Sequence, residues 1–114
     1  MITVEKNGRY GIKASGHAGY APKGQDIVCA AFTILIETAA ESVERMNDSG
    51  MLESVCVKLD DGEAVVSCVP YPEYENMAEN IFWVITNGIE LLCNMYPEYI
   101  QKNFRQGWKS QILL

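Results

Sequence analysis

The chain passes twice through the same order of elements, a predicted β-hairpin and then a long predicted helix, and this repeated order limits the fold more than any other feature. Apolar and polar residues alternate over residues 1–15 on either side of Asn7-Gly8, a dipeptide typical of two-residue hairpin turns. A second alternating stretch covers about residues 52–69, with its turn at Asp60-Asp61-Gly62. The sequence therefore predicts two antiparallel strand pairs.

Each hairpin is followed by a stretch with helical periodicity. Asp26 is a suitable N-cap for a helix that runs to about Asn47, with Gly50 just beyond its end. The second helix is predicted from about Tyr74 to Tyr96, and Pro97 stops it. The first helix is apolar around most of its circumference, which predicts burial on more than one side. Its polar residues form one narrow stripe, made of Thr33, Glu37, Glu41, Glu44 and Arg45.

This order predicts an α+β fold, a two-layer sandwich in which a mostly antiparallel sheet carries two main helices on one face, in the order ββαββα. Tyr99 to Phe104 could add a short final strand. A chain of 114 residues is large enough for one hydrophobic core but below the usual size for two. We therefore expect residues 1–114 to form a single domain, in which residues 102–114 could be a tail.

The charge balance argues against nucleic-acid binding. Nine basic residues stand against fifteen acidic ones, the net charge is −6, and no segment gathers Lys or Arg. No stretch approaches ~18 consecutive apolar residues, so no membrane span is expected. The N-terminal segment lacks the basic and apolar regions of a signal peptide. We therefore expect a cytoplasmic protein that binds neither nucleic acid directly nor membranes.

The four cysteines are scattered along the chain, and no two of them form a C-x-x-C pair. A tetrahedral zinc site needs about four ligands, usually presented as two close pairs, so we expect no metal and no other cofactor. A disulfide framework is not expected in an intracellular chain with a good core. Three of the four are predicted to be small buried apolar groups, namely Cys56, Cys68 and Cys93.

The remaining cysteine, Cys29, follows the only histidine, His17, by twelve residues. A thiol becomes a strong nucleophile only as a thiolate, and three factors that favour a thiolate are predicted to meet here. His17 supplies a base, the helix that begins at Asp26 presents the positive end of its dipole, and a glycine-containing loop lets the chain fold back. Backbone N–H groups at the helix start, including that of Cys29, could form an oxyanion hole. We interpret the pair as the active site of a cysteine peptidase.

Two residues near Cys29 have alternative roles. The side chain of Asp26 could cap the helix, it could orient the His17 ring as a third member of the site, or it could do both. Thr33 lies one helical turn after Cys29, and its hydroxyl could point toward the site or bond to the helix backbone. The alternative for the whole group is a loop histidine that bonds the backbone and a buried cysteine at the helix start, neither of them catalytic.

The run Gly16-His17-Ala18-Gly19-Tyr20, a loop that contains Gly24, and Asp26-Ile27-Val28-Cys29-Ala30-Ala31 together resemble the signature of the ribosomal-processing cysteine protease family, Prp. The similarity extends to the stretches 87–92 and 96–99, and it covers roughly residues 1–101. One difference is Thr33, because the family often has Ser one turn after the cysteine.

The resemblance implies a homodimer of a small α+β fold, in which His17 and Cys29 form the catalytic dyad and Asp26 is the acidic residue of the motif. It also implies a substrate, the precursor of a large-subunit ribosomal protein. The enzyme would remove an N-terminal extension after an aromatic pair and before a small residue. Loop 18–25 would be a mobile cover over the cleft. The loop residues expected there are Gly19, Tyr20 and Gly24.

Three other functions are compatible with the sequence. A non-enzymatic homodimeric protein acting in ribosome assembly would keep His17 and Cys29 as structural residues. A related peptidase that processes a phage structural protein would carry the same motif, and Thr33 and the tail bear on this choice of substrate. A redox sensor built on Cys29 would need a resolving cysteine, and none lies near it in the sequence.

Overall fold

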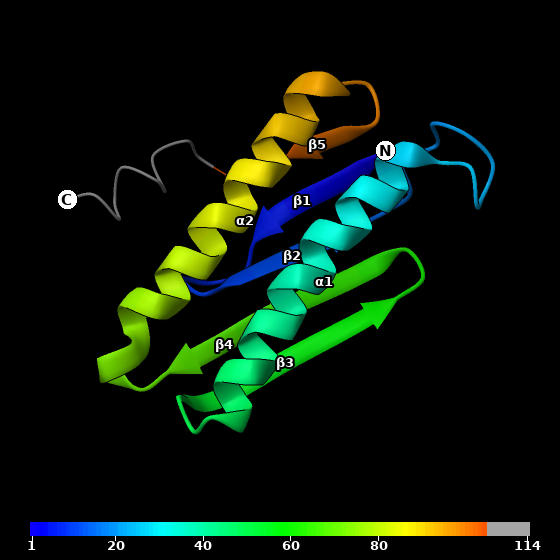
Figure 1. The fold of residues 1–114 in the computed structure, drawn as a ribbon. Helices are drawn as coiled ribbons and strands as arrows, with labels where there is room; N and C mark the ends of the chain where they lie inside the picture. Colours follow the sequence, from blue (N-terminus) through cyan, green and yellow to red (C-terminus); the bar gives the residue numbers. More distant parts are fainter. Residues whose placement is uncertain (105–114) are drawn as a thin grey trace.

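The structure, a computed structural model, describes residues 1–104. It contains the predicted two hairpins, each followed by a long helix, and then a short last strand (Figure 1). The predicted tail comprises residues 102–114. Its first residue, Lys102, is the last residue of that strand, and residues 105–114 lie outside the described residues. The bounds of the elements are β1 (Ile2–Lys6), β2 (Gly11–Ser15), α1 (Ile27–Asp48), β3 (Leu52–Asp60), β4 (Glu63–Pro70), the short 3-10 helix η1 (Pro72–Tyr74), α2 (Glu75–Met95) and β5 (Ile100–Lys102).

The strands form one five-stranded sheet in the order β3-β4-β2-β1-β5. Neighbouring strands are antiparallel except at one edge, where β5 runs parallel to β1 and places Ile100 beside Ile2. Both isoleucines are buried, so this pairing joins the two ends of the described chain through the core. The predicted α+β architecture, its mostly antiparallel sheet and its short final strand are confirmed.

The two hairpin turns differ in length. Asp60 pairs with Glu63, so Asp61 and Gly62 form a two-residue turn between β3 and β4. The predicted two-residue turn at Asn7-Gly8 is wrong, because the Asn7 N–H donates to the Gly11 carbonyl (3.0 Å) and leaves three residues, 8–10, between the strands. The longer turn lets Arg9 reach across to α2, where its guanidinium pairs with the buried carboxylate of Glu79.

Both long helices lie side by side on one face of the sheet, as Figure 1 shows. They approach closely at Gly88 of α2, where a Cβ atom would lie 2.7 Å from Cδ2 of Leu35 on α1. The predicted burial of α1 on more than one side holds for the sides facing the sheet and α2, whereas Ile27 and Ile34 are exposed. No helix of the described chain combines the length and the hydrophobicity that crossing a membrane requires. The largest fully buried side chains between the layers are Phe82, Ile89, Ile100, Val4, Val28, Val43 and Val66.

The cysteines are all free thiols, but they differ in burial. Cys68 is buried, and burial raises the pKa of its thiol to about 11. Burial also raises the pKa of Cys93, which is half-buried. The prediction that Cys56 is buried is wrong, because the alternation along β3 places it on the sheet face that the helices leave uncovered.

Candidate active site

His17 is placed by a tight turn at the end of β2. Gly16 has a φ of +94°, and a Cβ atom there would lie 2.3 Å from the carbonyl oxygen of Met1, so only glycine fits. The Gly16 N–H also donates to the Gly62 carbonyl (2.9 Å), which ties this turn to the β3–β4 hairpin. As a result, the imidazole of His17 stands at the surface, with 60% of its side chain exposed.

Cys29 is placed by the first turn of α1, and Asp26 is the N-cap of that helix, as one of the two alternatives predicted. Its Oδ1 accepts a hydrogen bond from the backbone N–H of Cys29 (2.9 Å). Its Oδ2 accepts from the N–H groups of Tyr20 (2.9 Å) and Ala21 (3.4 Å), which lie in the loop before the helix. One carboxylate therefore fixes both the helix start and the returning loop.

These bonds determine the ionisation of Asp26. Partial burial acts to raise the pKa of its carboxyl, but the backbone N–H groups that surround it act in the opposite direction and lower the pKa below its ordinary value of 3.8. The groups responsible are the N–H groups of Cys29, Ala21, Tyr20 and Val28. The charged form is thus the one that the fold stabilises.

The predicted site residues line one cleft of about 760 Å³ between the start of α1, the end of β2 and the β3–β4 turn. His17, Asp26, Cys29 and Thr33 all contribute to its walls. Thr33 is exposed there, and its hydroxyl makes no hydrogen bond to the helix backbone. His17 and Cys29 face the same space without a hydrogen bond between them. The arrangement offers a base and a nucleophile within one open site.

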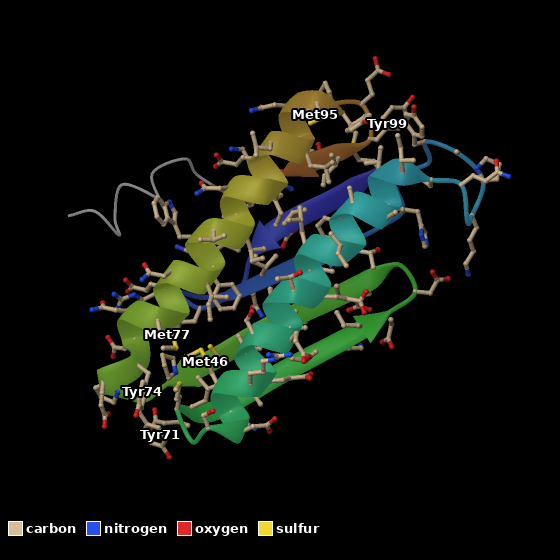
Figure 2. All side chains as sticks on the ribbon, viewed as in Figure 1. Met46, Tyr71, Tyr74, Met77, Met95 and Tyr99 are labelled. Carbon is tan, nitrogen blue, oxygen red and sulfur yellow. The ribbon has the colours of Figure 1, made fainter. Side chains whose placement is uncertain are left out.

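The loop residues divide between the cleft and a neighbouring aromatic cluster. Gly19 and Gly24 line the cleft, and both have positive φ angles, of 72° and 90°. Tyr20 instead packs edge-on against Tyr96 and Tyr99, with ring centroids 5.8 and 5.1 Å away. Figure 2 shows Tyr99 beside the end of α2, close to the loop that leads into α1. Aromatic contacts with the C-terminal part of the fold therefore anchor the loop.

One sequence-based expectation about this site is wrong. The N–H of Cys29 is not free to form an oxyanion hole, because it donates to Asp26. The capping geometry accounts for this outcome, since an N-cap carboxylate points toward the first-turn N–H groups. That Asp26 orients His17 stays a prediction, and the carboxylate that lies near the imidazole in this structure is that of Asp61.

Sequence reasoning missed Asp61 and Gly62, which it treated only as turn residues. Asp61 Oδ1 lies 3.8 Å from Nε2 of His17, and both turn residues line the cleft. No local motif signals this contact, because it depends on the pairing of β2 with β4, which sets Ser15 opposite Glu63. A correct strand order would have been the only sequence-level route to it. Among residues 1–104, no group of three or more His, Cys, Asp or Glu side chains is arranged to hold a metal ion.

Replacing Asp26 measures how much its hydrogen bonds contribute to the stability of the fold. We expect Asp26→Ala to lower the free energy of unfolding by about 1–2 kcal/mol at neutral pH. Because the pKa of Asp26 is lower in the folded than in the unfolded state, this contribution is complete above pH 3.8 and is lost as the pH falls through the folded-state pKa. Urea titrations of both proteins at a series of pH values measure the difference. Asp26→Asn is the control, since it keeps a cap oxygen for Cys29 but cannot ionise. A difference that is the same at all pH values would contradict this account.

Comparison with known proteins finds a protein family and individual relatives that are named as cysteine proteases. The model of the family described as cysteine protease Prp matches residues 1–101. A protein of Mycoplasma genitalium named ribosomal processing cysteine protease Prp is 34% identical over 94 residues, which cover 79% of this chain and 83% of the relative. The family match therefore includes the candidate site and nearly all of the described fold.

Two solved structures share the fold. The essential ribosomal processing protease Prp from S. aureus, in complex with a covalently linked product peptide, has a TM-score of 0.72 at 22% identity, over 92% of this chain and 100% of the other. The same protease with a substrate peptide has a TM-score of 0.67 at 20% identity, with the same coverage. At such identities the likeness shows the fold alone. The family match and the M. genitalium relative show more, and on their evidence the chain belongs to the Prp family of cysteine proteases.

Proposed function

We propose that this chain is a site-specific endopeptidase that removes the N-terminal extension of a large-subunit ribosomal protein precursor, with His17 and Cys29 as its catalytic dyad. The observation that carries the proposal is the position of Cys29 in the first turn of α1, in one cleft with His17, in a chain of a cysteine protease family. The name of the M. genitalium relative and the peptides held by the two S. aureus complexes support peptide processing as the activity.

In this mechanism, His17 takes the proton of the Cys29 thiol, and the thiolate attacks the carbonyl carbon of the scissile bond. The positive end of the α1 dipole stabilises the negative sulfur. His17 then gives its proton to the leaving amine, and water hydrolyses the acyl-enzyme to free the thiol. The two side chains are not hydrogen-bonded in this structure, so substrate binding has to bring them together.

Three other features assist the dyad in this proposal. Asp26 acts indirectly, because it fixes the backbone of Cys29 and holds the loop against the helix start. The exposed hydroxyl of Thr33, one turn along α1, is available to a bound peptide. Loop 18–25 is the mobile cover of the cleft, with Gly19 and Gly24 as flexible points and Tyr20 as its anchor.

We further propose that the protein acts in the cytoplasm as a homodimer. An apolar stripe on the outer face of α2, made of Met77, Val84, Leu91 and Met95, is 45% to 67% exposed in the single chain. Their spacing of seven and four residues places them on one side of the helix, and Figure 2 labels the two ends, Met77 and Met95. Contiguous exposed apolar surface of this kind marks protein interfaces.

The dimer proposal predicts that charged residues placed in this stripe separate the two subunits. We expect the double variant Val84→Glu and Leu91→Glu to sediment as a monomer, whereas the wild-type protein sediments as a dimer. The control is Asn76→Glu with Asn94→Glu, which adds the same charge at exposed positions of α2 beside the stripe. Sedimentation velocity at equal protein concentrations distinguishes a monomer from a dimer by the sedimentation coefficient. A wild-type protein that is monomeric, or a double variant that stays dimeric, would show that the stripe serves another purpose.

Cleavage of two synthetic peptides tests the activity itself. One carries an aromatic pair followed by Ala in a ribosomal-precursor context, and in the other both aromatic residues are replaced by Ala. We expect the wild-type protein to cut only the first peptide, and Cys29→Ala to lose at least about 10³-fold in rate because the nucleophile is gone. Cys56→Ala, which removes an exposed thiol outside the cleft, should cut normally. Mass spectrometry identifies the products.

Two results would count against this assignment. Undiminished cleavage by Cys29→Ala would exclude Cys29 as the nucleophile. Failure of the wild-type protein to cut either peptide would reject the ribosomal precursor as substrate and leave a different target, such as a phage structural protein, to be tried.

Thiol labelling separates a protease from a binding protein without any substrate. Cys56 is exposed and Cys29 only half-buried, so access alone would make Cys56 react faster with iodoacetamide. We instead expect Cys29 to react at least about tenfold faster than Cys56, because His17 promotes the thiolate form of Cys29. Cys68 and Cys93 should be slowest, since burial raises their pKa values. In His17→Ala the advantage of Cys29 should vanish. If Cys29 reacts no faster than Cys56 in the wild-type protein, a non-enzymatic role in ribosome assembly becomes the better account.

A further inference from the structure

The β3–β4 turn contacts the functional edge of His17. A Cβ atom on Gly62 would lie 2.9 Å from Nε2 and 3.6 Å from both Cδ2 and Cε1 of the imidazole. The ring edge that carries Nε2 therefore rests directly over the backbone of Gly62, in space that only a glycine leaves open. The φ of Gly62, +76°, also requires glycine at this position. The other turn residue, Asp61, brings its Oδ1 to 3.8 Å from the same Nε2 atom.

This contact is held in place by the sheet. β2 and β4 pair along Gly11–Ser15, so the end of β2 and the start of β4 lie side by side. Beyond the last pair, the Gly16 N–H donates to the Gly62 carbonyl (2.9 Å), which joins the residue before His17 to the turn. The neighbouring acidic residues of the hairpin, Asp60 and Glu63, also line the cleft, but their carboxylates pair with Lys58 (3.7 and 3.9 Å). Asp61 is the acidic residue of the turn that faces the ring.

We propose that the Asp61–Gly62 turn is the positioning element of His17, with Gly62 as the floor of the imidazole and Asp61 as the carboxylate that faces Nε2. The proposal rests on the dyad proposed above. The negative charge of Asp61 attracts the partly positive hydrogen of a ring N–H group. It therefore favours the tautomer of His17 that carries its proton on Nε2. Nδ1 is then the unprotonated nitrogen. The proton of the Cys29 thiol passes to Nδ1, which yields a thiolate and an imidazolium, and Asp61 stabilises the positive charge formed.

Alanine variants of two glycines, Gly62 and Gly8, test whether the contact of Gly62 with the imidazole positions His17. Gly8 and Gly62 both lie in hairpin turns with nearly equal positive φ, +74° and +76°, but a Cβ on Gly8 meets nothing within 4 Å. Alanine should therefore impose the same backbone strain at both positions. We expect the two variants to lose similar stability. Only Gly62→Ala should also lose activity, by roughly tenfold or more in kcat with KM little changed, because its methyl group displaces the imidazole.

The single histidine makes the role of Asp61 directly observable. In protein labelled with ¹⁵N-histidine, the two ring nitrogens of His17 report the tautomer at a pH at which the imidazole is neutral. We expect Asp61→Ala to lower the Nε2–H fraction and to reduce kcat by about two- to fivefold, as fits an exposed charge pair. Asp60→Ala removes the same charge from the neighbouring position and should keep the wild-type tautomer. Asp48→Ala, at the far end of α1, should keep the wild-type kcat.

The outcomes separate this proposal from the proposed function. An unchanged tautomer in Asp61→Ala, or equal kcat values for Gly62→Ala and Gly8→Ala in an active protease, would overturn the positioning role while leaving the dyad intact. A wild-type protein without peptidase activity would contradict the proposed function instead. Even then, the tautomer measurement still decides whether Asp61 acts on His17.

Discussion

One carboxylate, that of Asp26, fixes where the helical layer begins and how the chain reaches it. Buried backbone N–H groups need partners, and the first turn of a helix has none of its own. Asp26 supplies them to Cys29 on one side and to the loop residues Tyr20 and Ala21 on the other. The direction of the loop and the start of α1 are therefore set together. The carboxylate that lies near the imidazole of His17 comes from a different part of the chain, the β3–β4 turn.

The candidate site is accordingly assembled from three segments, each held by a different kind of interaction. A helix cap holds the nucleophile, a strand end with an obligatory glycine presents the base, and a hairpin turn supports the ring of that base. The pairing of β2 with β4 brings the last two together. Because sheet and helix positions are rigid, the part of the site left to adjust is the loop between His17 and Asp26. The aromatic contacts of Tyr20 limit that adjustment.

The sequence predicts the elements well and their contacts poorly. Periodicity and capping residues place α1 and α2 to within about one residue, because these signals are local. Alternation predicts both hairpins, but not the third residue of the first turn, because the Arg9–Glu79 pair that accompanies the longer turn involves a helix distant in the sequence. His17 and Cys29 are evident from the motif. Asp61 and Gly62 are not, because only the strand order of the sheet brings them to the cleft. The exposure of Cys56 likewise depends on which sheet face the helices cover.

The anchoring of Tyr20 on Tyr96 and Tyr99 has a consequence for the order in which the protein forms during synthesis. The loop beside the cleft belongs to the first quarter of the chain, yet the rings that hold it, and the strand that completes the sheet beside β1, come from near residue 100. Contacts between such distant positions form late, because closing a long loop costs entropy before the contact stabilises it. A growing polypeptide on the ribosome can pair its first hairpin early, but it cannot hold this loop in its final place until residues 96–102 have emerged.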